Sequence, residues 1–450
     1  MKIRALLVVS LVALSSCPDF DQLERDAICR NTPPACGDLG GGAGGGMGGG
    51  GGGATGGGGG STTGGGGGST PSDAFTDDGG LQVMAVARGA NASESRGLDA
   101  LGTTISWSST VACDGVLDGG FGTHGCTRSY SVTGTQVKLI NPGLMSYADI
   151  PLGVAVGPTA KASLDVVGGG STSLNLSVDP QDGRSMGGIF GPLDAVGPWS
   201  GSVVWVGPGK QFVAAFPAAQ HAGLTLWGYD FDLLDGGRLE DPSPVSACDV
   251  RVDDGAGARQ PDGTPVGAAF FAVALTPSCG DAGVALVRAG TDGVPSFPLP
   301  PLEVPSLRIA SAPGTLWGAS PGAGGGSELR RFAVSSAGLL TAAQAPWVLA
   351  GDWRQADVAA DDEGRPYLLG DGTGLAEDGG ARRAVWLASY GLDGGLRFRL
   401  PLPGTQTACA TALAWSSRGM AISGDCDAGS SDGVCVAGEG AFLTIVRVPR

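Results

Sequence analysis

The sequence has few histidines, few basic residues and no zinc-type spacing of cysteines. Its only histidines are His124 and His221, and two imidazoles exclude a three-histidine metal site. The 27 Lys and Arg residues are outnumbered by 43 Asp and Glu residues, which gives a net charge of −16. Such a surface repels phosphate backbones, so nucleic acid is not expected as a partner. No Cys-x-x-Cys pair occurs among the ten cysteines, which disfavours zinc.

Sustained helical periodicity is also missing from Leu81 onward, where Gly or Pro interrupts nearly every stretch of ten residues. The recurring pattern has period two. In Leu396–Leu400, "LRFRL", the apolar side chains alternate with two arginines, and in Tyr229–Leu233, "YDFDL", they alternate with two aspartates. Alternation of this kind predicts half-buried antiparallel strands and an all-β fold.

The first residues, "MKIRALLVVSLVALSSC", have the form of an export signal. Basic residues precede the apolar stretch Ala5–Leu14, which is too short to span a membrane. The sequence Leu14-Ser15-Ser16-Cys17 resembles the lipobox of bacterial lipoproteins, and the alternative is an ordinary signal peptide with a chance cysteine. The resemblance implies cleavage before Cys17, lipidation of that cysteine and stable anchoring by several acyl chains. Because Pro18 follows Cys17, it also implies delivery to the outer membrane.

Composition divides the chain into four segments. Residues 1–16 are the expected signal peptide, and residues 17–37 hold the anchor and a small cysteine loop. Residues 38–80 are almost wholly glycine in their central part, with few side chains to bury, and are expected to be a disordered linker. A phosphate-binding glycine loop needs a strand before it and a helix after it, and this tract has neither. Residues 81–450 are expected to fold as one domain.

Strand-sized segments recur in units of four between Leu81 and the C-terminus. Each unit consists of strand, Gly-containing turn, strand, loop, strand, Gly-containing turn and strand. Five units have equivalent apolar residues in their first strands, a weaker unit begins near Leu152, and another fits between Leu81 and Ile140. The five equivalent residues, spaced by about fifty positions, are Val203, Val250, Leu307, Val358 and Leu413. Four short strands in a repeat of this length predict a β-propeller of about seven four-stranded blades.

The stretch "VAADDEGRPYLLG" at Val358–Gly370 resembles the degenerate blades of bacterial propellers. The resemblance implies that blades pack face to face, with large apolar residues between them. Phe442–Val448 is expected to pair with a strand near Leu81–Ala87 and close the ring, which hides sheet edges. Tandem β-sandwiches are the alternative fold, although they do not explain the repeat length. The tryptophans expected between blades are Trp205, Trp227, Trp317, Trp386 and Trp415.

Leu-Asp-Gly-Gly occurs twice and is interpreted as a turn. Asp-Gly between alternating strands suits a two-residue hairpin because both residues tolerate positive φ. Asp235-Gly236 and Asp393-Gly394 are therefore expected to join the third and fourth strands of their blades, and Asp182-Gly183 and Asp292-Gly293 lie at corresponding points.

Ten cysteines in an exported chain predict disulfides, and lipidation of Cys17 leaves nine. Two of the expected pairs occupy equivalent positions in their repeats, where two adjacent antiparallel strands bring their ends together. Two further pairs would close local loops. Cys435 is then unpaired, although Cys426–Cys435 is a rival that would free Cys409. The four expected bridges are Cys248–Cys279, Cys409–Cys426, Cys113–Cys126 and Cys29–Cys36.

Catalytic patterns are scarce. "GASPG" at Gly318–Gly322 matches Gly-x-Ser-x-Gly, but a nucleophile elbow needs a helix after the serine, and a loop feeding a strand follows here. The acidic groups Asp253–Asp254, Asp361–Glu363 and Asp425–Asp427 are interpreted as solvated turn or loop residues. Asp361 and Asp362 are the candidates for a cation site at the propeller rim. No cofactor is expected.

These patterns predict a lipid-anchored, exported β-propeller, with no catalytic residues assigned. The expected function is a binding or structural module of the cell envelope, monomeric, with a protein or polysaccharide ligand at the blade loops or central channel. The alternative is a propeller enzyme, such as a lyase, hydrolase or cofactor-dependent oxidoreductase with a carboxylate-based site. Clustered charged groups in the channel would distinguish an active site from a plain scaffold.

Overall fold

The computed structural model consists of strands and turns in the part of the chain that it describes. That part begins at Leu81, so the expected signal peptide, Cys17, the Cys29–Cys36 loop and the glycine linker lie outside it. No described helix is long and apolar enough to cross a membrane. The described residues are 81–88, 95–110, 125–133, 136–145, 150–167, 173–180, 186–192, 200–207, 211–217, 223–230, 235–238, 248–276, 279, 282–290, 296–322, 326–341, 345–349, 353–375, 381–406, 408–426 and 440–449.

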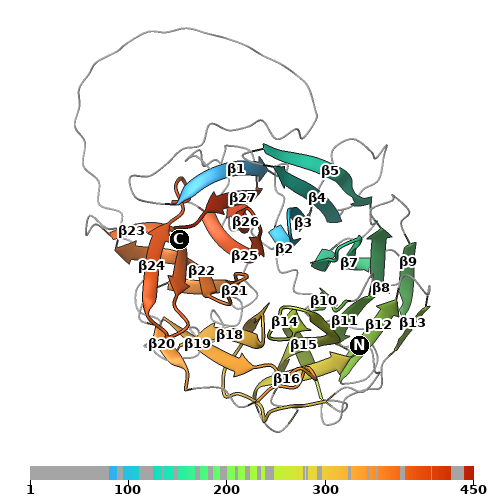
Figure 1. The fold of residues 1–450 in the computed structure, drawn as a ribbon. Helices are drawn as coiled ribbons and strands as arrows, with labels where there is room; N and C mark the ends of the chain where they lie inside the picture. Colours follow the sequence, from blue (N-terminus) through green and yellow to red (C-terminus); the bar gives the residue numbers. More distant parts are fainter. Residues whose placement is uncertain are drawn as a thin grey trace, which may run out of the picture. The chain divides into compact units, whose positions relative to one another are not determined.

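The described strands form seven antiparallel sheets, which are the blades of a β-propeller (Figure 1). Blade 1 contains β2 (Ser95–Leu101), β3 (Thr104–Thr110), β4 (Gly125–Thr133) and β5 (Gln136–Met145). Blade 2 contains β6 (Ile150–Val156), β7 (Ala160–Val167), β8 (Ser173–Pro180) and β9 (Met186–Pro192). Blade 3 contains β10 (Ser202–Trp205), β11 (Gln211–Pro217), β12 (Leu224–Asp230) and β13 (Asp235–Arg238).

The remaining blades follow in chain order. Blade 4 contains β14 (Val250–Arg259), β15 (Pro265–Leu275) and β16 (Gly283–Gly290). Blade 5 contains β17 (Arg308–Ala312), β18 (Thr315–Pro321), β19 (Ser327–Ala333) and β20 (Trp347–Leu349). Blade 6 contains β21 (Trp353–Ala360), β22 (Pro366–Leu375), β23 (Ala381–Tyr390) and β24 (Leu396–Pro401). Blade 7 contains β25 (Ala408–Ser416), β26 (Gly419–Cys426), β27 (Ala441–Arg447) and, from the other end of the chain, β1 (Gln82–Arg88).

The inner strand of each blade touches the inner strands of the next and the previous blade. Contacts run from β2 to β6, β10, β14, β17, β21, β25 and back to β2, so the ring is closed (Figure 1). The predicted propeller of about seven blades is therefore confirmed. The alternative of tandem sandwiches is wrong, because two facing sheets would not link their strands in a circle.

The hydrophobic core lies between the blades. Each cluster of buried side chains takes its members from two adjacent blades, as in the cluster that joins Leu316 and Phe332 of blade 5 to Phe270 of blade 4. Trp317 and Trp386 are fully buried between blades 5 and 6, and Trp205, Trp227 and Trp415 pack against other clusters. The five tryptophans occupy the predicted places, because the alternating pattern presents one face of each small sheet to its neighbour.

The ring is closed by the two ends of the domain. β1 pairs with β27 from Gln82↔Arg447 to Arg88↔Phe442, as predicted from the sequence. Leu81, Val83 and Val86 are at most 4% exposed and join the core between blades 6 and 7. The last blade is thus assembled from segments more than 300 residues apart.

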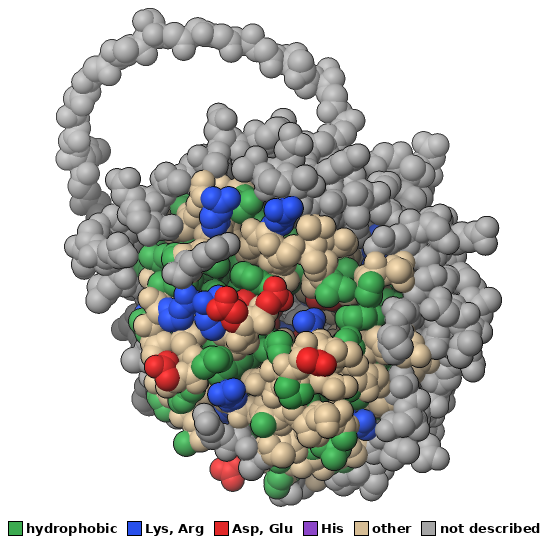
Figure 2. Space-filling view, viewed as in Figure 1, with side chains coloured by type: hydrophobic (Ala, Val, Ile, Leu, Met, Phe, Trp, Pro, Cys, Tyr) green, Lys and Arg blue, Asp and Glu red, His purple; other side chains and the backbone are tan. Residues whose placement is uncertain are grey.

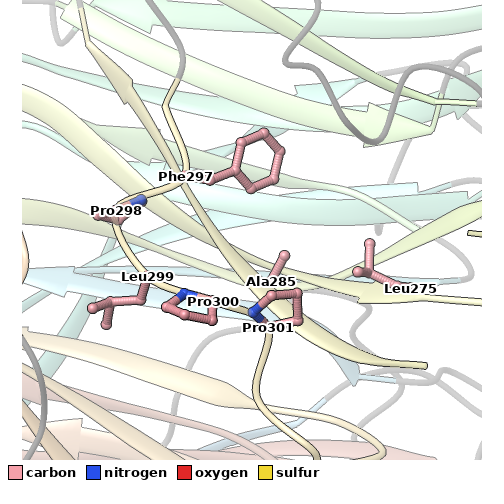
Figure 3. Close-up of a pocket in the computed structure, with 7 residues that line it drawn as sticks. All are labelled: Leu275, Ala285, Phe297, Pro298, Leu299, Pro300 and Pro301. Atoms are coloured by element: carbon pink, nitrogen blue, oxygen red, sulfur yellow. The ribbon is translucent and has the colours of Figure 1, made fainter. Parts of the chain in front are cut away.

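Blade 4 departs from the predicted four strands, since three are found among its described residues. The following segment makes only isolated bridges, Arg288↔Ser296 and Val284↔Leu302. Between them the chain carries Pro298, Pro300 and Pro301, whose nitrogens cannot donate to a ladder. An apolar cavity of about 380 Å³ lies between this segment and the strands β15 and β16 (Figure 3).

The predicted turn at Asp393-Gly394 joins β23 to β24, with a five-residue loop in place of the expected two-residue loop. Asp393 Oδ1 accepts from Gly395 N at 3.0 Å. Gly394 has φ +88° and packs so closely on Trp347 that a Cβ would meet the indole ring at 2.8 Å. The other prediction was wrong in detail, because Asp235 and Gly236 pair with β12 inside strand β13. The Asp182-Gly183 and Asp292-Gly293 turns lie outside the described residues.

One predicted disulfide, Cys248–Cys279, is present and links the start of blade 4 to the chain just after β15. Cys409 and Cys426 are also disulfide-bonded. They lie one residue out of register on β25 and β26, where Cys409 faces Asp425 and Ala408 faces Cys426. Their predicted pairing with each other stays a prediction, as does Cys113–Cys126, of which Cys113 lies outside the described residues.

Candidate functional site

The inner strands surround a polar channel with a cavity of about 320 Å³. Every blade contributes to its wall through its inner strand. Figure 2 shows acidic and basic side chains gathered around the hollow at the centre of the ring. The channel therefore holds clustered charged groups, the feature expected from the sequence to distinguish an active site from a plain scaffold.

A recurring β-bulge sets which residues face the channel. The register shifts by one residue in β2, β6, β14, β21 and β25, and the residue after each bulge lines the cavity. In blades 3 and 5 the residues at the corresponding level are Ser202 and Arg308. Ser202 lies against Gly153 of blade 2, and Ile309, the residue after Arg308, donates its N–H to Asp254 of blade 4. We call this level the channel ring; in blade order its members are Gly97, Gly153, Ser202, Asp254, Arg308, Asp357 and Ala412.

Charge is confined to one side of the channel ring. Blades 4, 5 and 6 contribute Asp254, Arg308 and Asp357, which we call the charged arc. The four other members are glycine, serine or alanine. Arg308 is exposed to the channel, and both aspartates are partly accessible there. At this level the ring is thus charged on one side and lined by small residues on the other, while Arg96 and Asp99 of blade 1 also line the cavity.

The two aspartates also connect neighbouring blades. Asp254 Oδ2 accepts from Ile309 N at 2.8 Å, and Asp357 Oδ2 accepts from Leu413 N at 2.7 Å. The other oxygen of each accepts from the next residue of its own strand. An inner strand has no ladder partner on its channel side, so these N–H groups would otherwise lack an acceptor. An aspartate inside an inner strand is therefore a link between blades as well as part of the channel wall.

A third carboxylate lies two residues past the channel ring in blade 1. Asp99 Oδ1 accepts from Ala100 N at 2.8 Å, and its Oδ2 accepts from Val156 N of blade 2 at 2.7 Å. Asp371 and Asp425, on second strands, form similar links, the former to Ala410 N and the latter to Ser95 N. Neighbouring blades are thus repeatedly linked by an aspartate carboxylate that accepts a backbone N–H of the next blade.

The channel carboxylates hold their protons unusually tightly. Burial raises the pKa of Asp254 to about 6, and the charge of Arg308 opposes the rise. Burial raises the pKa of Asp357 to about 8, with a further contribution from the negative charge of Asp254. Burial likewise raises the pKa of Asp99 to about 6. The charge of Asp254 raises the pKa of Asp99 and of Asp357, and the charge of Arg308 lowers the pKa of Asp254 and of Asp357. The protonation of these groups is therefore linked.

These shifts predict the direction of the pH dependence. An unfolded aspartate has a pKa of about 3.9, so the folded state binds more protons than the unfolded state from that pH up to the folded pKa. The contribution of the three carboxylates to stability is complete in acid and is lost as the pH rises through about 6 to 8. Asp357→Asn is therefore expected to flatten the fall in unfolding free energy between about pH 5 and 8.5, measured by urea titration. The exposed Asp262→Asn is the control and should keep the wild-type slope; an unchanged slope in Asp357→Asn would contradict the prediction.

The predicted cation-site residues lie in the β21–β22 hairpin. Asp361 is only 2% exposed. Its Oδ1 accepts from Glu363 N and Arg365 N, and its Oδ2 accepts from Arg365 Nε and from the Tyr367 hydroxyl. Asp362 is exposed and lines the cavity. No group of three potential metal-binding side chains occurs among the described residues, and a cation at Asp361 and Asp362 stays a prediction.

Ser320 and the pair Asp253–Asp254 all lie within strands. Ser320 of the Gly-x-Ser-x-Gly match is fully buried within β18, and the described chain continues into strand β19, so the elbow geometry is absent there. The interpretation of Asp253 and Asp254 as turn residues was wrong, because both lie inside β14. Asp253 pairs with Arg251 at 2.7 Å and accepts from Leu307 N of the next blade.

Asp99 and Arg308 were not predicted from the sequence as channel residues. A usable signal was present, because a charged residue among the apolar positions of an inner strand breaks the alternating pattern. Placing such residues at one level, however, requires the bulges, which shift the register by one residue without an obvious mark in the sequence.

No protein-family model and no curated protein matches this sequence. Solved structures with similar coordinates include the β-propeller domain of the Trilobed protease from Pyrococcus furiosus, at 10% identity and a TM-score of 0.46, covering 79% of this chain and 94% of that one. The BP39L lectin from Burkholderia pseudomallei has 11% identity and a TM-score of 0.47, with 78% and 99% covered.

A prolyl endopeptidase structure has 12% identity and a TM-score of 0.47, with 75% of this chain covered. This chain spans only 45% of that protein's length. The names of these structures include peptidases and a lectin, and at this level of similarity they assign no function to this chain.

Proposed function

We propose that this protein is an exported, lipid-anchored β-propeller that binds a ligand in its central channel at the bacterial cell envelope. The observation that supports binding is the charged arc, which places two carboxylates and an exposed guanidinium on one side of a polar cavity of about 320 Å³. Because the two aspartates also link blades, the feature that favours binding over a plain scaffold is the exposed guanidinium that they flank in the cavity.

The lipobox-like Leu14–Cys17 supports the anchor, and the outer membrane is the proposed destination. The Cys248–Cys279 disulfide agrees with an oxidising compartment outside the cytoplasm. In cells, Cys17→Ser is expected to move the protein from the membrane fraction to the soluble exported fraction, because stable anchoring requires the acyl chains. Unchanged membrane retention of this variant, with the leader removed, would contradict the lipid anchor.

Channel binding is tested by filling the cavity without touching the arc. Ala412 belongs to the channel ring and lies on its small-residue side. Ala412→Phe is expected to abolish binding of any channel ligand found by calorimetric screening, because the added ring occupies the cavity. Ala412→Ser is the matched control and should bind normally. If a ligand still binds the phenylalanine variant with full affinity, its site is elsewhere and the proposed function is wrong.

A carboxylate-based hydrolase or lyase is the second candidate. The observation in its favour is that Asp254 and Asp357 have different raised pKa values, about 6 and about 8, so one carboxylate is mostly ionised and the other mostly protonated near neutral pH. Acid–base enzymes arrange paired carboxylates in this way. Conversion of a bound ligand by the wild type, abolished in Asp357→Asn while binding persists, would select this candidate.

A further inference from the structure

We propose that the channel ligand is a zwitterion of amino-acid or dipeptide size, with its carboxylate on Arg308 and its ammonium group between Asp254 and Asp357. This inference rests on the proposed function, because it requires the channel to be a binding site. It adds the chemical class of the ligand and the role of each charged residue.

The order of charges along the arc is the first argument. Three consecutive blades place a carboxylate, a guanidinium and a carboxylate at one level of the channel. Within the arc, a simple cation would meet Arg308 as well as the acids, and a simple anion would meet two carboxylates beside Arg308. Arg96, Asp99 and Arg259 also line the cavity but lie outside the arc. A ligand with both signs close together complements the arc on both counts, and electrostatic complementarity is a main source of specificity.

Arg308 has the chemistry required for a ligand carboxylate. Its Nη1 donates to the carbonyl oxygen of Asp253, which fixes the guanidinium at the channel wall, and the side chain is exposed to the cavity. A guanidinium carries five N–H donors in a planar fork that matches the two oxygens of a carboxylate. The Arg308 guanidinium is therefore an anion-binding group that its hydrogen bond to Asp253 of blade 4 holds in place.

Asp254 and Asp357 have the chemistry required for an ammonium group. Each carboxylate oxygen accepts one backbone N–H, and each oxygen has two lone pairs, so acceptor capacity remains. The negative charge of Asp254 raises the pKa of Asp357, which shows that the two carboxylates act on one another. A ligand ammonium between them would relieve this repulsion and favour the ionised form of Asp357.

The opposite side of the channel ring sets the size of the ligand. Gly97, Gly153, Ser202 and Ala412 line the opposite wall of the cavity, where none of them carries a long side chain. The cavity of about 320 Å³ lies at the small end of the range of roughly 300–1,000 Å³ that is usual for ligand pockets. A free amino acid or a dipeptide fits this volume class better than a large glycan or a folded partner.

The experiment compares ligands that differ only in their terminal charges. The detergent-solubilised full chain is titrated calorimetrically with alanyl-alanine, with its N-acetyl form and with its C-terminal amide. We expect the unblocked dipeptide to bind at least about tenfold more tightly than either blocked form, which corresponds to about 1.4 kcal/mol for each lost charge contact. Equal affinity for the three ligands, or no binding of alanyl-alanine at about 10 mM, would overturn the inference.

Variants assign the two charges to residues. Arg308→Gln should weaken alanyl-alanine about tenfold and leave the weaker affinity of the amide unchanged, because the amide has no carboxylate to lose. Arg383→Gln, on an exposed position of β23, is the matched control and should behave as wild type. If Arg308→Gln weakens the amide as much as the free dipeptide, the assignment of the carboxylate to Arg308 is wrong.

Proton release gives a readout that a purely structural role would not produce. Binding of the ammonium should ionise Asp357, whose pKa burial raises to about 8. Titrations of the wild type at pH 7 in buffers of different ionisation enthalpy should therefore report proton release, and Asp357→Asn should remove it. Proton release that persists in this variant would contradict the assignment.

Failure of this inference can be separated from failure of the proposed function. If a neutral saccharide such as maltose binds, Ala412→Phe abolishes that binding and alanyl-alanine does not bind, the channel is a ligand site for another chemical class. If ligands of both kinds bind with full affinity to Ala412→Phe, both proposals fall.

Discussion

A chain that begins at residue 95, and therefore lacks β1, is expected to lose its cooperative folded state. The ring depends on β1 because its six residue pairs with β27 complete the last blade. Leu81, Val83, Met84 and Val86 are at most 4% exposed. Burial of each such side chain is worth about 1.5–3 kcal/mol, so the four together contribute roughly 6 kcal/mol or more. That amount is comparable with the whole stability of a typical domain, about 5–15 kcal/mol.

The measurement is scanning calorimetry of exported protein, with a chain that begins at residue 81 as the control. The control keeps β1 and every described contact, so its unfolding temperature should match that of the longer chain within a few degrees. Val83→Asp in the control chain should have a similar destabilising effect without any deletion, because it places a charge at a fully buried position of β1. A shortened chain that unfolds at the same temperature as the control would show that the ring does not need its closing strand.

The second large effect is expected for Asp361→Asn, which should lower the free energy of unfolding by about 3–5 kcal/mol. Its carboxylate oxygens take four hydrogen bonds inside the β21–β22 hairpin, two of them from Arg365 Nε and the Tyr367 hydroxyl. An amide presents an NH₂ group where one of those oxygens was, so a buried donor faces Arg365 without an acceptor. Removal of one partner of a buried charged pair typically costs this much.

Asp362→Asn provides a neighbouring acidic control. Asp362 is exposed, so its replacement should change the stability by no more than about 0.5 kcal/mol. Urea titrations of both variants with calcium and with EDTA also test the cation hypothesis. We expect the loss in Asp361→Asn to be the same under both conditions. A calcium-dependent stabilisation of the wild type that both variants remove would instead support a metal at these two residues.

Much of the fold could be predicted because each blade repeats a local pattern. Alternating side chains define the strands, their recurrence at about fifty residues defines the blades, and the apolar segment Phe442–Val448 needs an antiparallel partner that only the other end of the domain supplies. Trp317 and Trp386 follow from the same logic, since a blade of four short strands buries a large ring only against its neighbour.

The charged arc could not be predicted because it depends on non-local geometry. The run Asp253-Asp254-Gly255 has the composition of a turn, yet Asp254 lies mid-strand because the inner strand has unpaired N–H groups that need acceptors from the adjacent blade. Arg308 joins Asp254 and Asp357 only once three blades are placed in a ring. That the described part of blade 4 has three strands was predictable in principle, since Pro298, Pro300 and Pro301 argue against a ladder.

The position of β1 also decides how the protein responds to mechanical force. The chain that precedes residue 81 enters the propeller through β1, so tension applied from that side reaches the β1–β27 pairs first. In this antiparallel pair, Gln82 lies opposite Arg447, so a load applied at Gln82 peels the strands apart one pair at a time. We therefore expect the β1–β27 pairs to separate first under such a load, before the other pairs of the blades.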